Sequence, residues 1–193
     1  MVVVHDYLAR LVGKELVDDI LTAGGRHYAP SAAEVYVPVE FADAAYRYGH
    51  SQIRHEYRLR AGRRARLLFP DLMGFGPVPA DHRLDLEQIF DFPQRPPAQR
   101  AKKIDGSLSQ SLIALPRQVT GEVIDRAYES LAVRDLLRGA ATGLPSGEAV
   151  AAALGAPTLT VEQIGPDWQG GTPLWLYALK EAGCLGDGTG LAR

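Results

Sequence analysis

A glycine- and proline-rich stretch at residues 62–100 most limits the folds open to this chain. Only short apolar groups interrupt it, and one of them, residues 84–89, fits a single short helix. A connection of this length is usually functional or pinned against other parts of the protein. The residues on both sides carry helical patterns, so the sequence predicts a mainly α fold with long irregular loops.

Apolar side chains recur at helical spacing over most of the remaining chain. Ser146 is placed to cap a helix that Gly155 ends, and Pro173 stands near the start of the last helix. The helices that we expect lie at residues 2–21 (broken at Gly13), 40–60, 98–104, 107–112, 121–138, 147–154 and 174–182.

Composition bounds the class of protein. The chain has 193 residues, a formal net charge of -2 and 46% hydrophobic residues, as in one globular domain or a piece of a larger one. This balance argues against nucleic acid as the main partner. The basic clusters at residues 58–66 and 95–103 are better read as solvated faces or as counter-charges for an anion.

Targeting and redox signals are sparse. Cys184 is the only cysteine, so an internal disulfide is excluded. The first residues do not form a signal peptide, and no apolar stretch is long enough to span a membrane. The compartment stays open: cytoplasmic is the default, and secretion is the alternative if a leader precedes the chain.

The five histidines narrow the possible chemistry. No pair has the one-turn spacing of a helical zinc site, and HExxH, GxSxG and Walker motifs are absent. His50 lies between Gly49 and Ser51 in the 40–60 segment, where small neighbours leave its imidazole accessible to a flat, bulky group. Haem iron needs a single such ligand. Spacing alone nevertheless favours a hydrogen-bonded core histidine.

A resemblance changes that balance. The segment Tyr46-Arg-Tyr-Gly-His-Ser-Gln-Ile-Arg54 resembles the proximal-histidine helix of the animal-type haem peroxidase family, with its aromatic-Arg-x-Gly-His-Ser/Thr pattern. Residues 3–13 and 131–145 resemble two further family segments in the family's order, and the second ends in Arg-x-x-x-x-Gly-Leu-Pro. Residues 172–182 are similar to bacterial members. The resemblance implies that His50 is the axial ligand of haem b.

The same resemblance implies roles for two residues of the 131–145 segment. Asp135 stands where the family has an Asn that accepts a hydrogen bond from the proximal imidazole. A carboxylate there would increase the anionic character of the imidazole and favour ferric iron. Arg138 matches the family's arginine to a haem propionate. The alternatives are a surface acid and a solvated cation.

The resemblance also implies what lies outside the chain. In the family, the distal histidine, the distal arginine and the calcium loop precede every segment matched here, and a closing helix follows. His5 stands in a different motif and is not a substitute. Residues 1–193 are therefore expected to form a single partial haem peroxidase domain, its proximal half. The family's covalent haem links use acidic residues of the other half.

Three functions remain. The first is a haem peroxidase of oxidative stress, which in the complete domain oxidises small organic or halide donors with hydrogen peroxide. The second is a fatty-acid dioxygenase of the same superfamily, but its radical-forming tyrosine, three residues before the ligand, is replaced by Arg47. The third is a truncated, non-catalytic remnant that binds haem weakly or not at all and exposes apolar surface.

Overall fold

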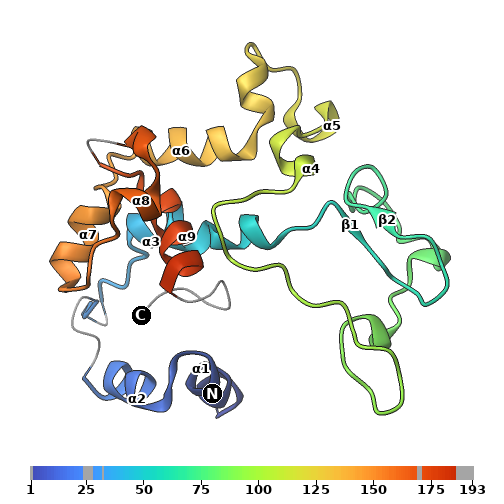
Figure 1. The fold of residues 1–193 in the computed structure, drawn as a ribbon, viewed down its shortest axis with the longest axis horizontal. Coiled ribbons are helices and arrows are strands. Elements are labelled where there is room, and N and C mark those ends of the chain that lie inside the picture. The colour runs from blue at the N-terminus through green and yellow to red at the C-terminus, as the bar shows by residue number, and fades with distance from the viewer. Residues whose placement is uncertain (1, 24–27, 32, 169–170, 186–193) are drawn as a thin grey trace. The chain divides into compact units, whose positions relative to one another are not determined.

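The computed structural model describes residues 2–23, 28–31, 33–168 and 171–185. Helices predominate among them, and their only sheet has two short strands, so the prediction of a mainly α protein is confirmed. The chain forms two compact units, and Figure 1 labels its helices and strands. Unit 1 comprises residues 1–48, 103–106 and 135–193, and unit 2 comprises residues 49–102 and 107–134.

The elements follow one another along the chain in a fixed order. The α-helices are α1 (Val2–Val12), α2 (Lys14–Ala23), α3 (Val39–Asp43), α4 (Gln110–Ile113), α5 (Arg117–Thr120), α6 (Leu131–Ala141), α7 (Gly147–Leu154), α8 (Val161–Ile164) and α9 (Leu174–Leu185). The 3-10 helices are η1 (Ala45–Gln52), η2 (Ala80–His82), η3 (Leu86–Gln88), η4 (Arg126–Glu129) and η5 (Pro166–Trp168). The strands are β1 (Glu56–Tyr57) and β2 (Arg66–Leu67).

The predicted break in the first helical segment is confirmed. Gly13 has φ 91°, a backbone conformation that favours glycine, and it separates α1 from α2. The two helices pack against each other, and the ring Nε2 of His5 lies 3.2 Å from an Asp18 carboxylate oxygen. His5 therefore has a structural partner on the neighbouring helix.

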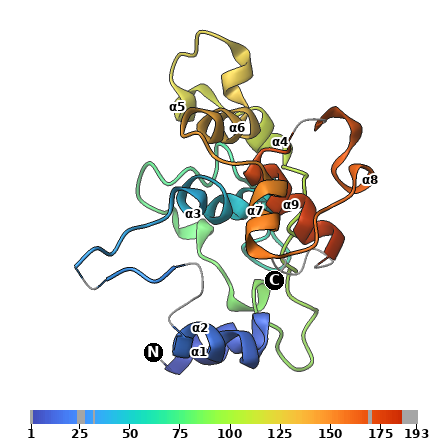
Figure 2. The ribbon, with the colours of Figure 1, turned by 90° about the vertical axis from the view of Figure 1, so that its left-hand side faces the viewer.

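The core of unit 1 is built around α9, which contacts both α7 and α8. Figure 2, turned by 90° from the view of Figure 1, shows α7 and α9 side by side. Tyr177 of α9 packs with apolar residues of α7, of α8 and of the segment between them, and its side chain is 3% exposed. Its hydroxyl accepts a 2.9 Å hydrogen bond from the backbone N–H of Leu159. Apolar packing and this hydrogen bond together fix the position of the ring.

Reciprocal hydrogen bonds join the starts of α7 and α9. Ser146 caps α7 as predicted by accepting from the N–H of Ala149, and Gly155 ends the helix in the left-handed conformation. The N–H of Gly147 donates to the Thr172 carbonyl at 2.9 Å. The N–H and hydroxyl of Thr172 donate to the Glu148 carboxylate at 2.9 and 2.5 Å.

Unit 2 contains the predicted irregular stretch, which is pinned by side-chain contacts to backbone. The strands β1 and β2 pair antiparallel, with Glu56 opposite Leu67 and Tyr57 opposite Arg66. Gln99 exchanges two hydrogen bonds with the backbone of Arg58, at 2.9 and 2.6 Å. The expected short helix near residues 84–89 is present as η3.

The expected long helix at residues 40–60 is wrong. The chain forms α3 and then the tighter η1, and residues 53–55 before β1 are not helical. Gly49 and Ser51 are poor helix formers. The N–H of Arg54 donates to the Tyr57 hydroxyl at 3.0 Å instead of to a helical carbonyl, which fixes the exit from η1.

Two further helix predictions need correction. In the segment 121–138, residues 121–125 are not helical, and Ser130 is extended (φ -85°, ψ 123°) between η4 and α6. Residues 98–104, all described by the structure, contain no helix. There the N–H of Ala98 donates to the Asp91 carboxylate and that of Gln99 to the Gln88 carbonyl, each at 3.0 Å. These hydrogen bonds hold the start of the segment against residues 88–91.

Candidate functional site

Asp135 is a buried acid of unit 1. It lies on α6 with a side-chain exposure of 2%, so it is not a surface acid of an amphipathic helix. A buried carboxylate is costly unless it is paired and hydrogen-bonded. The charged side chains next to Asp135 therefore determine whether its carboxylate can accept a further hydrogen bond.

Asp135 is one end of a row of four side chains of alternating charge within unit 1. A guanidinium nitrogen of Arg47 lies 3.8 Å from an Asp135 carboxylate oxygen and another lies 3.6 Å from Asp43. Asp43 in turn lies 3.7 Å from a guanidinium nitrogen of Arg138. Two acids thus alternate with two arginines, which balances their charges. We name these four residues the Asp135 cluster.

The cluster joins two segments far apart in the sequence. Asp43 is the last residue of α3 and Arg47 lies in η1, whereas Asp135 and Arg138 lie on α6. A second contact reinforces the connection in unit 1, because the indole N–H of Trp175 on α9 donates to the Arg47 carbonyl at 3.2 Å. The start of η1 is thus fixed by both a charged cluster and a buried aromatic side chain.

Exposure differs sharply across the cluster. The Asp43 side chain is 13% exposed and that of Arg47 is 25% exposed, whereas Arg138 is 52% exposed. The buried Nε of Arg47 has no hydrogen-bond partner among the described residues. The cluster therefore offers one accessible guanidinium, Arg138, and one buried donor with unused capacity. The accessible guanidinium of Arg138 suits a further carboxylate-bearing group at this place.

The described part of unit 1 includes a smaller and a larger hollow. The smaller, of about 230 Å³, is bounded by α6 and the start of α9, with Asp135, Gly139 and Trp175 in its wall. The larger, of about 1010 Å³, is mostly apolar and is lined by α7, α9 and residues 36–41. Glu181 lies at the larger hollow, and burial raises the pKa of its carboxyl.

His50 lies in unit 2, close to the end of η1, and its side chain is partly buried. Ser51, the next residue, is fully buried. Asp135 belongs to unit 1, so the two residues are described in separate units and the pairing of imidazole with carboxylate stays a prediction.

Sequence reasoning missed two members of the cluster, Asp43 and Arg47. A signal was present, because an acid and a base four residues apart in a helical segment form an ion pair. Their connection to Asp135 depends on tertiary structure, so sequence spacing carries no trace of it.

Neither protein-family models nor curated protein sequences nor solved structures gave a match to this chain. Among the residues that the structure describes, no helix has both the length and the apolar character needed to cross a membrane. The arguments that follow therefore use this chain's own residues.

Proposed function

We propose that this chain is the proximal part of a haem peroxidase domain, in which His50 binds the haem iron. The observation that carries the proposal is the ion pair between Arg47 and the buried Asp135. Each residue belongs to a segment that resembles the peroxidase family, and these segments are far apart in the sequence. The resemblance implies that the two segments meet beside the proximal histidine, and the ion pair supports such a meeting.

The residues divide the work of holding the cofactor. His50 would supply one imidazole nitrogen to the iron, since the macrocycle supplies four. Asp135 would accept the other ring N–H and fix the imidazole's orientation, while Arg47 limits the negative charge that the carboxylate passes on. Arg138, half-exposed and bound on one side to Asp43, has donors left for a propionate.

Haem, when bound, supplies the site for peroxide-dependent oxidation of small organic or halide donors. Turnover also needs a general acid–base group near the peroxide, and no residue of this chain is assigned that role. We therefore expect the isolated chain to bind hemin and to oxidise a dye little faster than free hemin. Rapid turnover by the isolated chain would contradict this division of roles.

Hemin titration tests the proposal directly. The chain is titrated with hemin and the Soret band is recorded for wild type, His50→Ala and the control His82→Ala. We expect saturation at one hemin per chain in wild type and in the control, and loss of the Soret shift in His50→Ala. An unchanged spectrum in His50→Ala would refute the ligation. Far-UV circular dichroism of each variant checks that it is folded.

Asp135→Asn separates the second role from the first. The substitution keeps the side-chain volume and the hydrogen-bond acceptor but removes the charge. We expect hemin binding to persist while the ferric–ferrous reduction potential rises, because a neutral partner leaves the imidazole less anionic. An identical potential in wild type and Asp135→Asn would exclude the contact between this carboxylate and the ligand.

One observation favours a second function. Large apolar side chains are exposed along residues 35–41, including Val35 at 73% and Val37 at 67%. Contiguous apolar surface promotes association, as expected of a non-catalytic remnant. A chain that aggregates and gives no saturable hemin spectrum would support this alternative. The structure adds no support for the dioxygenase function, which needs a tyrosine three residues before the ligand. That residue is Arg47, and it is ion-paired.

A further inference from the structure

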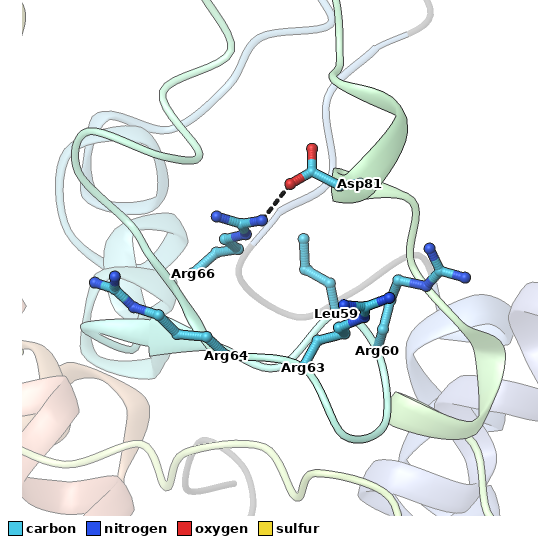
Figure 3. A pocket seen from close by; sticks show the side chains of 6 residues that line it. All are labelled: Leu59, Arg60, Arg63, Arg64, Arg66 and Asp81. Atoms are coloured by element: carbon cyan, nitrogen blue, oxygen red, sulfur yellow. Dashed lines mark hydrogen bonds and ion pairs between the residues drawn. The ribbon is translucent and has the colours of Figure 1, made fainter.

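Four arginines of unit 2 line one hollow. Arg60, Arg63, Arg64 and Arg66 surround a space of about 330 Å³, together with Leu59 and Asp81 (Figure 3). These arginines belong to the β1–β2 hairpin, whose connecting loop spans residues 58–65. The hollow lies wholly within unit 2 and shares no residue with the Asp135 cluster.

The backbone of the hairpin gathers these charges. Gly62 has φ 65°, a left-handed conformation, and the N–H of Arg63 donates to the Arg60 carbonyl at 3.4 Å. The N–H of Asp85 donates to the Leu59 carbonyl at 2.8 Å, which ties residues 80–85 to the loop. The turn and this tie hold the arginines around the same space.

The ionic partners divide the arginines into two pairs. Arg66 is ion-paired with Asp81, and Arg60 lies 3.6 Å from Asp85. In Figure 3 the Arg66 side chain reaches toward Asp81, whereas Arg60 and Arg64 extend toward opposite sides. These two carboxylates fix the outer arginines of the loop. They also cancel two of the four positive charges.

The positive charges of Arg63 and Arg64 are not balanced by an acidic partner among the described residues. Both are exposed, and neither side chain has an ion pair or hydrogen bond with another described residue. Four guanidiniums against two carboxylates leave two positive charges beside one hollow. Each guanidinium presents a fork of donors that matches the oxygens of a phosphate group. The uncompensated charge equals that of a dianion.

We propose that this hollow binds a small phosphate-bearing anion through Arg63 and Arg64, with Arg60 and Arg66 shaping its walls. The volume lies at the lower end of ligand pockets, so the ligand is a phosphate or diphosphate group with little attached to it. A soluble metabolite and a lipid headgroup share this chemistry. The site is independent of haem, because His50 takes no part in it.

Titration calorimetry of the full chain with inorganic pyrophosphate, at about 0.15 M ionic strength, tests the proposal. We expect saturable binding of one pyrophosphate per chain, weakened about tenfold or more in Arg63→Gln/Arg64→Gln. The matched control is Arg117→Gln/Arg126→Gln, which removes two exposed arginines of the same unit outside the hollow. Binding by the control and by His50→Ala should stay within about twofold of wild type.

The outcomes are decisive in both directions. If phosphatidic acid vesicles displace bound pyrophosphate at a lower phosphate concentration than free pyrophosphate needs, the natural ligand is a lipid headgroup. If they need a higher concentration, the ligand is soluble. Both results support the proposal. Absence of saturable pyrophosphate binding overturns it, as does equal weakening in the control. Tighter binding of citrate overturns the phosphate class. Binding of a single-stranded oligonucleotide that both double variants weaken alike shows nonspecific charge and also overturns it. Circular dichroism confirms that each variant is folded.

Discussion

Gly147 faces the ring of Tyr177 more closely than any side chain could. A Cβ atom at residue 147 would lie 1.9 Å from the Tyr177 Cγ and 2.2 Å from its Cβ. Both distances are far inside van der Waals contact, and the nearest atoms belong to the base of the ring instead of a flexible end. Gly147→Ala therefore forces α7 and α9 apart or drives the ring out of its place.

The cost follows from what holds the ring. Overpacking a core costs about 1–3 kcal/mol. If the ring moves, the buried N–H of Leu159 loses the Tyr177 hydroxyl, which adds about 1–3 kcal/mol. We expect Gly147→Ala to lower the free energy of unfolding by about 2–5 kcal/mol.

Urea denaturation followed by far-UV circular dichroism measures this change, provided that the m-value stays constant. Gly76→Ala is the control: a Cβ there meets nothing within 4 Å, so we expect a change within about 0.5 kcal/mol. In a Tyr177→Phe background the hydrogen bond is already gone, so Gly147→Ala should cost less by about 1–3 kcal/mol. A wild-type midpoint for Gly147→Ala would refute the packing of α7 against α9 described above.

Three further predictions concern charge and capping. Burial favours the neutral form of Glu148, but the hydrogen bonds from Thr172 outweigh it and hold the pKa of its carboxyl below the ordinary 4.5. Its contribution to stability is therefore present above pH 4.5 and lost as the pH falls through the lowered pKa, so unfolding curves of Glu148→Gln should depend less on pH in the acid range. Burial raises the pKa of Glu181, so ionisation opposes folding as the pH rises through that pKa. Glu181→Gln should melt at a higher temperature than wild type at neutral pH and at the same temperature once the wild-type carboxyl is protonated; an equal difference at both pH values would exclude this cause. Thr160 and Gln163 form a capping box at α8, so Thr160→Ala should cost about 1 kcal/mol in urea denaturation and Thr160→Ser much less.

Features set by neighbouring residues were predictable from the sequence. The cap at Ser146, the end at Gly155 and the break at Gly13 depend on capping chemistry and glycine conformation, which act over a few residues. The helix predicted at residues 40–60 was wrong because Gly49 and Ser51 are weak helix formers and the Arg54 N–H donates to the Tyr57 hydroxyl instead of to a helical carbonyl. The strand pairing of residues 56–57 with 66–67 was not predictable, because strands of two residues are too short to show an alternation of apolar and polar side chains.

The candidate site was predictable only in part. The resemblance singled out Asp135 and Arg138, and the structure shows that Asp135 is buried. The charges that accompany it come from Asp43 and Arg47, whose distance along the chain hides the connection. Similarly, the basic residues 58–66 were read as solvated or as counter-charges, and only the hairpin reveals which arginines keep an unbalanced charge.

The hydrogen bond from the Trp175 indole to the Arg47 carbonyl makes this tryptophan an optical probe of the segment that leads to His50. The chain has two tryptophans, and the second, Trp168, packs beside α8. With Trp168 replaced by Phe, the emission would come from one buried indole whose N–H is already engaged. Loss of the cluster around Arg47 would then appear as a red shift in fluorescence, which makes the integrity of this segment measurable without any cofactor.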